Sequence, residues 1–142
     1  MADIAAVLDH YRGPYLPEED EVPWLIAGRE AVAAAVRSVL LIADSVLAGR
    51  EDERLIAALE SALGADPTSE DLARALMRAY ARRGQNTEAI RVYRRLKEML
   101  SIMLGLPPSR ETEQLRDDLY AKVSAGDTKE RADATARGRA SP

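Results

Sequence analysis

Histidine and cysteine form many metal sites and nucleophilic catalytic centres, and this chain is almost without them. It contains a single histidine, His10, and no cysteine. A histidine-based metal site or a Ser/His/Asp triad would have to be built around His10. No partner set for such a site is visible in the sequence. We therefore interpret His10 as a surface or packing residue, and we expect no metal site and no cofactor.

The other patterns that carry chemistry also point away from catalysis. No GxxxxGK, GxGxxG, HExxH or GxSxG motif occurs, so the sequence offers no phosphate-binding loop, zinc-protease helix or nucleophile elbow. An acidic run covers residues 18–21, and neighbouring carboxylates of this kind can bind a cation. Carboxylates ahead of a helix are more often solvated groups favoured by the helix dipole, and we prefer that interpretation. We expect this chain not to be an enzyme.

Basic side chains are concentrated in two predicted helices of the C-terminal half, together with Tyr80 and Tyr93. Such a cluster could contact nucleic-acid phosphates, with the tyrosines stacking on bases. Both tyrosines, however, lie at apolar packing positions, where burial explains them better. Direct DNA contact is therefore the less favoured interpretation, and we favour a protein-binding face. The predicted partner surface comprises Arg78, Arg82, Arg91 and Arg95.

Length and composition limit the architecture and the location. The 142 residues suit one domain with a core of its own. The absence of cysteine fits a reducing compartment, and the N-terminal residues lack the basic and apolar regions of a signal peptide. The apolar run over residues 32–48 is interrupted by Arg37 and Asp44, so we do not expect it to span a membrane. We expect a cytoplasmic protein.

Apolar residues recur three and four positions apart along most of the chain, which is the period of an amphipathic helix. Glycine and proline separate these stretches, because glycine adopts the left-handed conformation that ends a helix and proline cannot continue one. We expect the side chains of Thr68 or Ser69 and of Asn86 to cap two of the helices. The predicted helices cover residues 2–9, 23–48, 52–65, 69–83, 86–104 and 109–123.

The C-terminal residues differ in composition from the rest. From Ser124 to Pro142 the chain has mixed charge and no aromatic or large aliphatic residue. Such a segment cannot offset the entropic cost of ordering itself. We therefore predict a folded domain over residues 1–123 and a disordered tail over residues 124–142.

The second to fifth predicted helices form two hairpins whose landmarks recur about 34 residues apart, the period of tetratricopeptide repeats. Two repeats are usually too few for a stable array. We expect the outer helices and the aromatic stretch from Tyr11 to Trp24 to cap the stack. The predicted fold is all-α, a tetratricopeptide-like right-handed stack of about six antiparallel helices. The aligned pairs are Ala43 with Met77, Val46 with Tyr80, Ile56 with Ile90, and Leu59 with Tyr93.

Several stretches, taken in order, resemble one known family. YRGPYLP, the pair Pro23 and Trp24 followed by Arg29, and the turn ADP resemble its first landmarks. RALMRAYARRGQNTEAIRVYRRLKEML and LGLPPSRETEQL resemble its second repeat and its closing segment. From Ala5 to Val123 the chain is thus similar to the bacterial transcriptional activator domain of antibiotic regulatory proteins.

The resemblance implies a scaffold function for the residues that carry it. Two features depart from the family pattern: Pro107 stands where an acidic residue is common, and the acidic link before Pro23 is enlarged. The implied scaffold residues are Tyr11, Arg12, Gly13, Trp24, Arg29, Pro67, Tyr80, Gly84, Tyr93, Gly105 and Pro108.

The resemblance also implies a function. A domain of this kind helps its parent transcription factor dimerise, or contacts RNA polymerase, while a separate winged helix-turn-helix domain reads DNA. That DNA-binding domain is missing from this chain, so we expect either an excised fragment or a free-standing variant. The alternative hypothesis is a stand-alone helical-repeat adaptor without a transcriptional role. A winged helix upstream of Met1 in the natural reading frame favours the first hypothesis, and a native start codon favours the second.

Overall fold

The computed structural model describes residues 23–46 and 53–139. All regular structure in these two ranges is helical and none of it is a strand, which confirms the all-α class. Outside the described residues lie the predicted helix over residues 2–9 and the predicted C-terminal end of the helix over residues 23–48. The helices are α2 (Pro23–Val46), α3 (Glu53–Ala65), α4 (Glu70–Arg82), α5 (Asn86–Leu104) and α6 (Arg110–Arg139).

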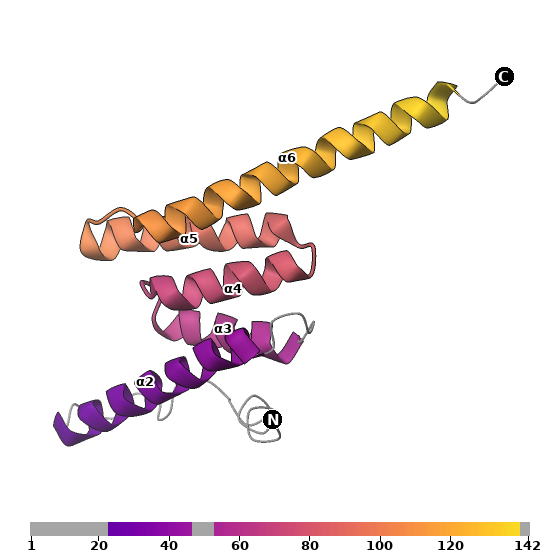
Figure 1. The fold of residues 1–142 in the computed structure, drawn as a ribbon. Coiled ribbons are helices and arrows are strands. Elements are labelled where there is room, and N and C mark those ends of the chain that lie inside the picture. The colour runs from indigo at the N-terminus through magenta and orange to yellow at the C-terminus, as the bar shows by residue number, and fades with distance from the viewer. Residues whose placement is uncertain (1–22, 47–52, 140–142) are drawn as a thin grey trace.

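The helices are stacked side by side in chain order (Figure 1). α3, α4 and α5 lie as adjacent rods, and short turns at alternate ends connect α3 to α4 and α4 to α5. α2 packs on α3 and α4, while α6 packs on α5 and α4. Parts of α2 and α6 extend beyond the stack, toward opposite sides of the view (Figure 1). α4 is the central helix, because it contacts the other four.

Two glycines end α4 and α5, as the sequence predicts. Gly84 has a φ of 72° and Gly105 a φ of 65°, in the left-handed region that side chains with a Cβ disfavour. After α4, the N–H of Gln85 donates to the carbonyl of Tyr80 at 3.0 Å, and the N–H of Gly84 donates to that of Ala81 at 3.0 Å. This Schellman pattern satisfies the last carbonyls of α4 and turns the chain back toward α5.

The predicted cap of α4 is correct in position at Ser69, but no side chain caps α4 or α5 as expected. Ser69 is the N-cap of α4, but its hydroxyl makes no capping bond, and the Thr68 hydroxyl donates instead to Asp66 Oδ1 at 3.3 Å. The N-cap of α5 is Gln85, and Asn86 is the first helical residue. The Oδ1 atom of Asn86 is buried without a hydrogen-bond partner among the described residues. Packing of the two helices, rather than side-chain capping, therefore stabilises their starts.

The buried residues form three groups, and α4 contributes to each of them. The first group joins α2, α3 and α4 and includes Ala43 and Leu59. The second joins α4, α5 and α6 and includes Met77 and Tyr93. Ala43 and Leu59 thus lie in one buried group, and Met77 and Tyr93 lie together in the next. The third group comprises Ala73, Leu96 and Leu100.

Four apolar residues that the helical period groups with the apolar faces of α2 and α5 are 40–57% exposed: Val32, Ile42, Val46 and Met103. Val46, which the repeat aligns with Tyr80, lies in the last turn of α2 and is exposed, whereas Tyr80 packs against two core groups. Met103 lies in the last turn of α5, past Leu100, the last residue of α5 in the core.

The predicted disordered tail is helical as far as Arg139, because α6 continues through Ser124 without a break. Alanine and arginine, which favour helix, make up seven of residues 124–139, and the next proline is Pro142. Every side chain from Ser124 to Arg139 is exposed. The segment contributes no side chain to the core, although it is helical. Residue 123 stays the predicted end of the packed domain.

Candidate protein-interaction surface

Two of the four predicted partner-binding arginines are held by a carboxylate of α2. Asp44 is only 6% exposed although it is acidic. Its Oδ1 lies 2.6 Å from Nη2 of Arg82, and its Oδ2 lies 3.6 Å from Nε of Arg78. Because both guanidinium groups point back to α2, they hold α2 against α4. Arg78 and Arg82 thus have an intramolecular partner.

The other two arginines lie on α5 and are more available. Arg91 is 69% exposed and pairs along its own helix with Glu88, at 2.9 Å. Arg95 is exposed and has no hydrogen bond or ion pair with any described residue. The four predicted arginines therefore divide into an engaged pair on α4 and an outward-facing pair on α5.

Arg95 borders a groove between α3 and α5. The groove has a volume of about 330 Å³, and α4 contributes Leu76 to its lining. Leu76 and Leu96 are almost fully buried, so they form its floor, while Arg95 and Glu60 supply charge at its edges. The turn before α4 contributes the scaffold residue Pro67. The groove is lined by Glu60, Leu63, Pro67, Leu76, Val92, Arg95 and Leu96.

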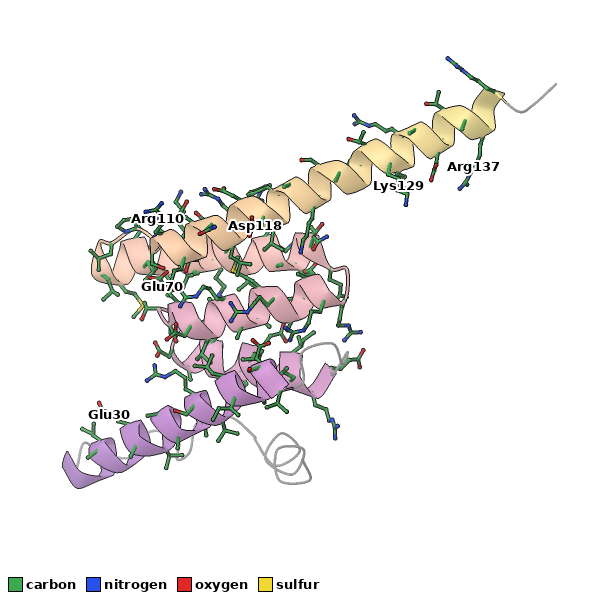
Figure 2. All side chains as sticks on the ribbon, viewed as in Figure 1. Glu30, Glu70, Arg110, Asp118, Lys129 and Arg137 are labelled. Carbon is green, nitrogen blue, oxygen red and sulfur yellow. The ribbon has the colours of Figure 1, made fainter. Side chains whose placement is uncertain are left out.

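A polar cluster joins the start of α6 to the start of α4, near the labels of Glu70 and Arg110 in Figure 2. Glu70 Oε2 accepts hydrogen bonds from the Ser109 N–H at 2.8 Å, the Ser109 hydroxyl at 2.7 Å and the Thr112 hydroxyl at 2.6 Å. Arg74 donates to Thr112 Oγ1 at 3.0 Å. These contacts orient the first turn of α6, so the role of the cluster is structural.

The surroundings of Glu70 lower its pKa. Burial by itself raises the pKa of this carboxyl, but hydrogen bonds from Thr112 and Ser109 and the charge of Arg74 outweigh that effect. Neither this polar cluster nor the role of Asp44 was predicted from the sequence. An acidic residue on the apolar face of α2 was the available signal for Asp44, because a buried charge requires a partner.

Two scaffold tyrosines place their hydroxyls on carboxylates of neighbouring helices. The Tyr80 hydroxyl donates to Glu60 of α3, and burial together with this bond raises the pKa of Tyr80 to about 12. The Tyr93 hydroxyl donates to Glu113 of α6 at 2.5 Å, and Arg116 stands over the Tyr93 ring, 5.2 Å from its centroid. Burial, followed by the bond to Glu113, raises the pKa of Tyr93. Both rings serve packing, as the sequence predicts.

The remaining scaffold residues are described only in part. Pro108 is buried just before α6. Arg29 is partly buried in α2, where its Nε and Nη2 have no hydrogen-bond partner among the described residues. Trp24 belongs to the first turn of α2, but its side chain lies outside the described set, as does His10. Also outside the described residues are Tyr11, Arg12, Gly13 and the acidic run over residues 18–21.

The described helices hold neither a metal-binding cluster nor a membrane-spanning segment. No group of three or more histidine, cysteine, aspartate or glutamate side chains within residues 23–46 and 53–139 is arranged to hold a metal ion. None of the helices in those ranges combines the length and the apolar character needed to cross a bilayer.

The model of the bacterial transcriptional activator domain matches residues 1–120, which is most of the chain. No curated protein and no solved structure matches this sequence.

Proposed function

This chain belongs to the bacterial transcriptional activator domain family, and from this premise we propose that it is the regulatory protein-interaction domain of a bacterial transcription regulator. It mediates dimerisation, contact with RNA polymerase, or both. Another domain reads the promoter. The work takes place in the cytoplasm and involves no catalysis.

The helix arrangement supports a tetratricopeptide-like right-handed stack as part of this proposal. Consecutive helices pack on one another, and α4 is shared by successive layers. Ala43 with Leu59 in one layer and Met77 with Tyr93 in the next repeat the same pairing. Stacks of this kind leave helix faces and grooves free for partners.

The observation that carries the proposal is the outward arginine pair of α5. Arg91 and Arg95 lie one helical turn apart, so they share one side of α5. Arg95 has no partner in the described part of the chain and borders an apolar groove. We place the contact with the partner here, whereas Arg78 and Arg82 mainly hold α2 in position.

The test uses the double variant Arg91→Glu with Arg95→Glu. Self-association is measured by light scattering, and polymerase binding by pull-down with purified RNA polymerase. We expect at least one of the two to weaken by about tenfold or more, since reversing interfacial charge costs on the order of 2 kcal/mol. Lys97→Glu is the control, because Lys97 is exposed on nearly the opposite side of α5.

Unchanged self-association and unchanged polymerase binding in a folded double variant would refute this surface. If the wild-type domain neither self-associates nor binds polymerase, the proposed function itself is wrong. In that case a stand-alone adaptor is the better description.

A further inference from the structure

The groove between α3 and α5 combines an apolar floor with one uncompensated charge. Leu76 and Leu96 are nearly inaccessible at its base, and Leu63 and Val92 are partly exposed in its walls. A volume of about 330 Å³ is at the lower end of the range for small-molecule pockets. The groove can take one or two apolar side chains of a partner rather than a large ligand.

The charges at its edge are not equivalent. Glu60 already accepts a hydrogen bond from the hydroxyl of Tyr80, so its carboxylate has a partner. Arg95 has none among the described residues. Arg91, one turn earlier on the same side of α5, pairs with Glu88 of its own helix at 2.9 Å. Arg95 is therefore the guanidinium at this edge that is left without a partner among the described residues, and it complements a carboxylate beside the bound apolar groups.

The apolar surface continues along α5 past the groove. Met99 and Ile102 follow Arg95 at helical spacing, four and seven positions on, so they lie on the same side of the helix. Ile102 is 71% exposed, and Met103 beside it is about half exposed. Large aliphatic side chains in adjacent exposed positions are typical of an interaction site. Arg95 thus stands between two apolar areas.

We infer that this surface, from Leu63 and Val92 through Arg95 to Ile102, binds an acidic amphipathic segment of a partner protein. The apolar side chains of the segment enter the groove and cover Ile102, and a carboxylate pairs with the Arg95 guanidinium. Arginine suits this role, because its planar fork donates two parallel bonds to one carboxylate. The inference rests on the proposed function and names the chemistry of its partner.

In the experiment, a random library of linear peptides is displayed on phage, and the peptides that bind the purified full chain are selected. We expect the enriched peptides to combine aspartate or glutamate with leucine, isoleucine or phenylalanine at helical spacing. A synthetic peptide from the enriched set, labelled with fluorescein, then gives affinities by anisotropy. We expect Arg95→Glu to weaken binding about tenfold or more, and added salt to weaken binding to the wild type.

Two further variants make the result specific. Ile102→Ser is expected to weaken peptide binding about threefold or more, as apolar contact is lost. Lys97→Glu changes the net charge by the same amount as Arg95→Glu but on the other side of α5. It is expected to change the peptide affinity less than twofold. Thermal melts confirm that each variant is folded. Both Arg95 and Ile102 are exposed, so their replacement leaves the core intact.

Three results would overturn the inference: no enrichment, enrichment of peptides without acidic residues, or equal peptide affinity for the wild type and Arg95→Glu. Light scattering and polymerase pull-down on the same variants distinguish a failure of this inference from a failure of the proposed function. Dimerisation or polymerase binding without peptide selection refutes only this inference. Peptide binding that depends on Arg95, without dimerisation or polymerase binding, refutes only the transcriptional role.

Discussion

At the scale of single residues, the structure assigns Asp44 a role that its charge would not suggest. It lies on the side of α2 that faces the core and is almost inaccessible to solvent. Its two oxygens engage Arg82 and Arg78, one turn apart on α4. A buried carboxylate is tolerated when partners compensate for its lost hydration. Asp44 therefore fixes the position of α2 on α4.

The variant Asp44→Asn tests this role. It keeps the shape of the side chain but removes the charge that Arg82 and Arg78 compensate, so we expect it to lower the free energy of unfolding by about 1–3 kcal/mol. Urea denaturation at neutral pH measures the change. Asp117→Asn is the matched control, since Asp117 pairs with Arg116 at an exposed site and should matter by less than about 1 kcal/mol. Equal effects of the two changes would contradict the assignment.

The lowered pKa of Glu70 predicts a specific acid sensitivity. Its carboxyl titrates below the ordinary value of 4.5 in the folded protein. The charged form is therefore favoured by folding, and its contribution is fully present at neutral pH. It is lost as the pH falls below about 4.5 and through the lowered pKa.

The comparison of wild type with Glu70→Gln isolates this contribution. We expect the wild type to be the more stable protein at neutral pH, and the difference between the two to shrink as the pH falls through that range. Urea denaturation over a series of pH values measures it. A difference that stays constant down to strongly acidic pH would show that ionisation of Glu70 does not stabilise the fold.

At the scale of helices, the turns are determined by backbone conformation rather than by side-chain capping. The Schellman bonds after α4 satisfy the carbonyls of Tyr80 and Ala81, and they require the positive φ of Gly84. The side chains of Ser69 and Gln85 make no capping bond. One glycine thus sets the reversal that brings α5 onto α4.

We expect Gly84→Ala to lower the free energy of unfolding by about 1 kcal/mol, because alanine disfavours the left-handed region. Gly64→Ala is a well-matched control. A Cβ atom at either glycine would meet no atom within 4 Å, so neither change causes a clash. Gly64 lies in the last turn of α3, where alanine should be neutral or mildly stabilising. Chemical denaturation measures both, and equal losses would contradict this explanation.

At the scale of the molecule, the stack has a stable centre and a solvated extension. α4 contributes to all three buried groups. Loss of the contacts made by α4 would therefore disrupt the whole core. The part of α6 beyond the other helices, which carries Lys129 and Arg137, is surrounded by solvent (Figure 2). The two regions should open with very different free energies.

Native-state hydrogen exchange tests this gradient. We expect the amides of α4, around Leu72 to Met77, to exchange only through global unfolding, because both flanking layers must open first. The amides of residues 124–139 should exchange orders of magnitude faster, since no buried side chain holds that segment. Mass spectrometry after peptic digestion resolves the two regions. Similar protection in both would refute this description of the stack.

The sequence alone determined the all-α class and the five helices of the described residues, but not the C-terminal extent of α6. These features are local: the helical period is set by apolar spacing, and the turns by the φ of glycine. Val46 was misplaced: the repeat aligns it with the partly buried Tyr80, but its own side chain is 47% exposed.

Only the tertiary structure decided which of the four predicted arginines are available. Arg82 meets Asp44 across 38 positions of sequence, and no local pattern specifies that pairing. Glu70 meets Ser109 in the same way, 39 positions away. Electrostatic partners are determined by distance in space and by burial, and both arise only when the helices are packed. The helices are therefore encoded locally, whereas the free charge of Arg95 is a property of the packed stack.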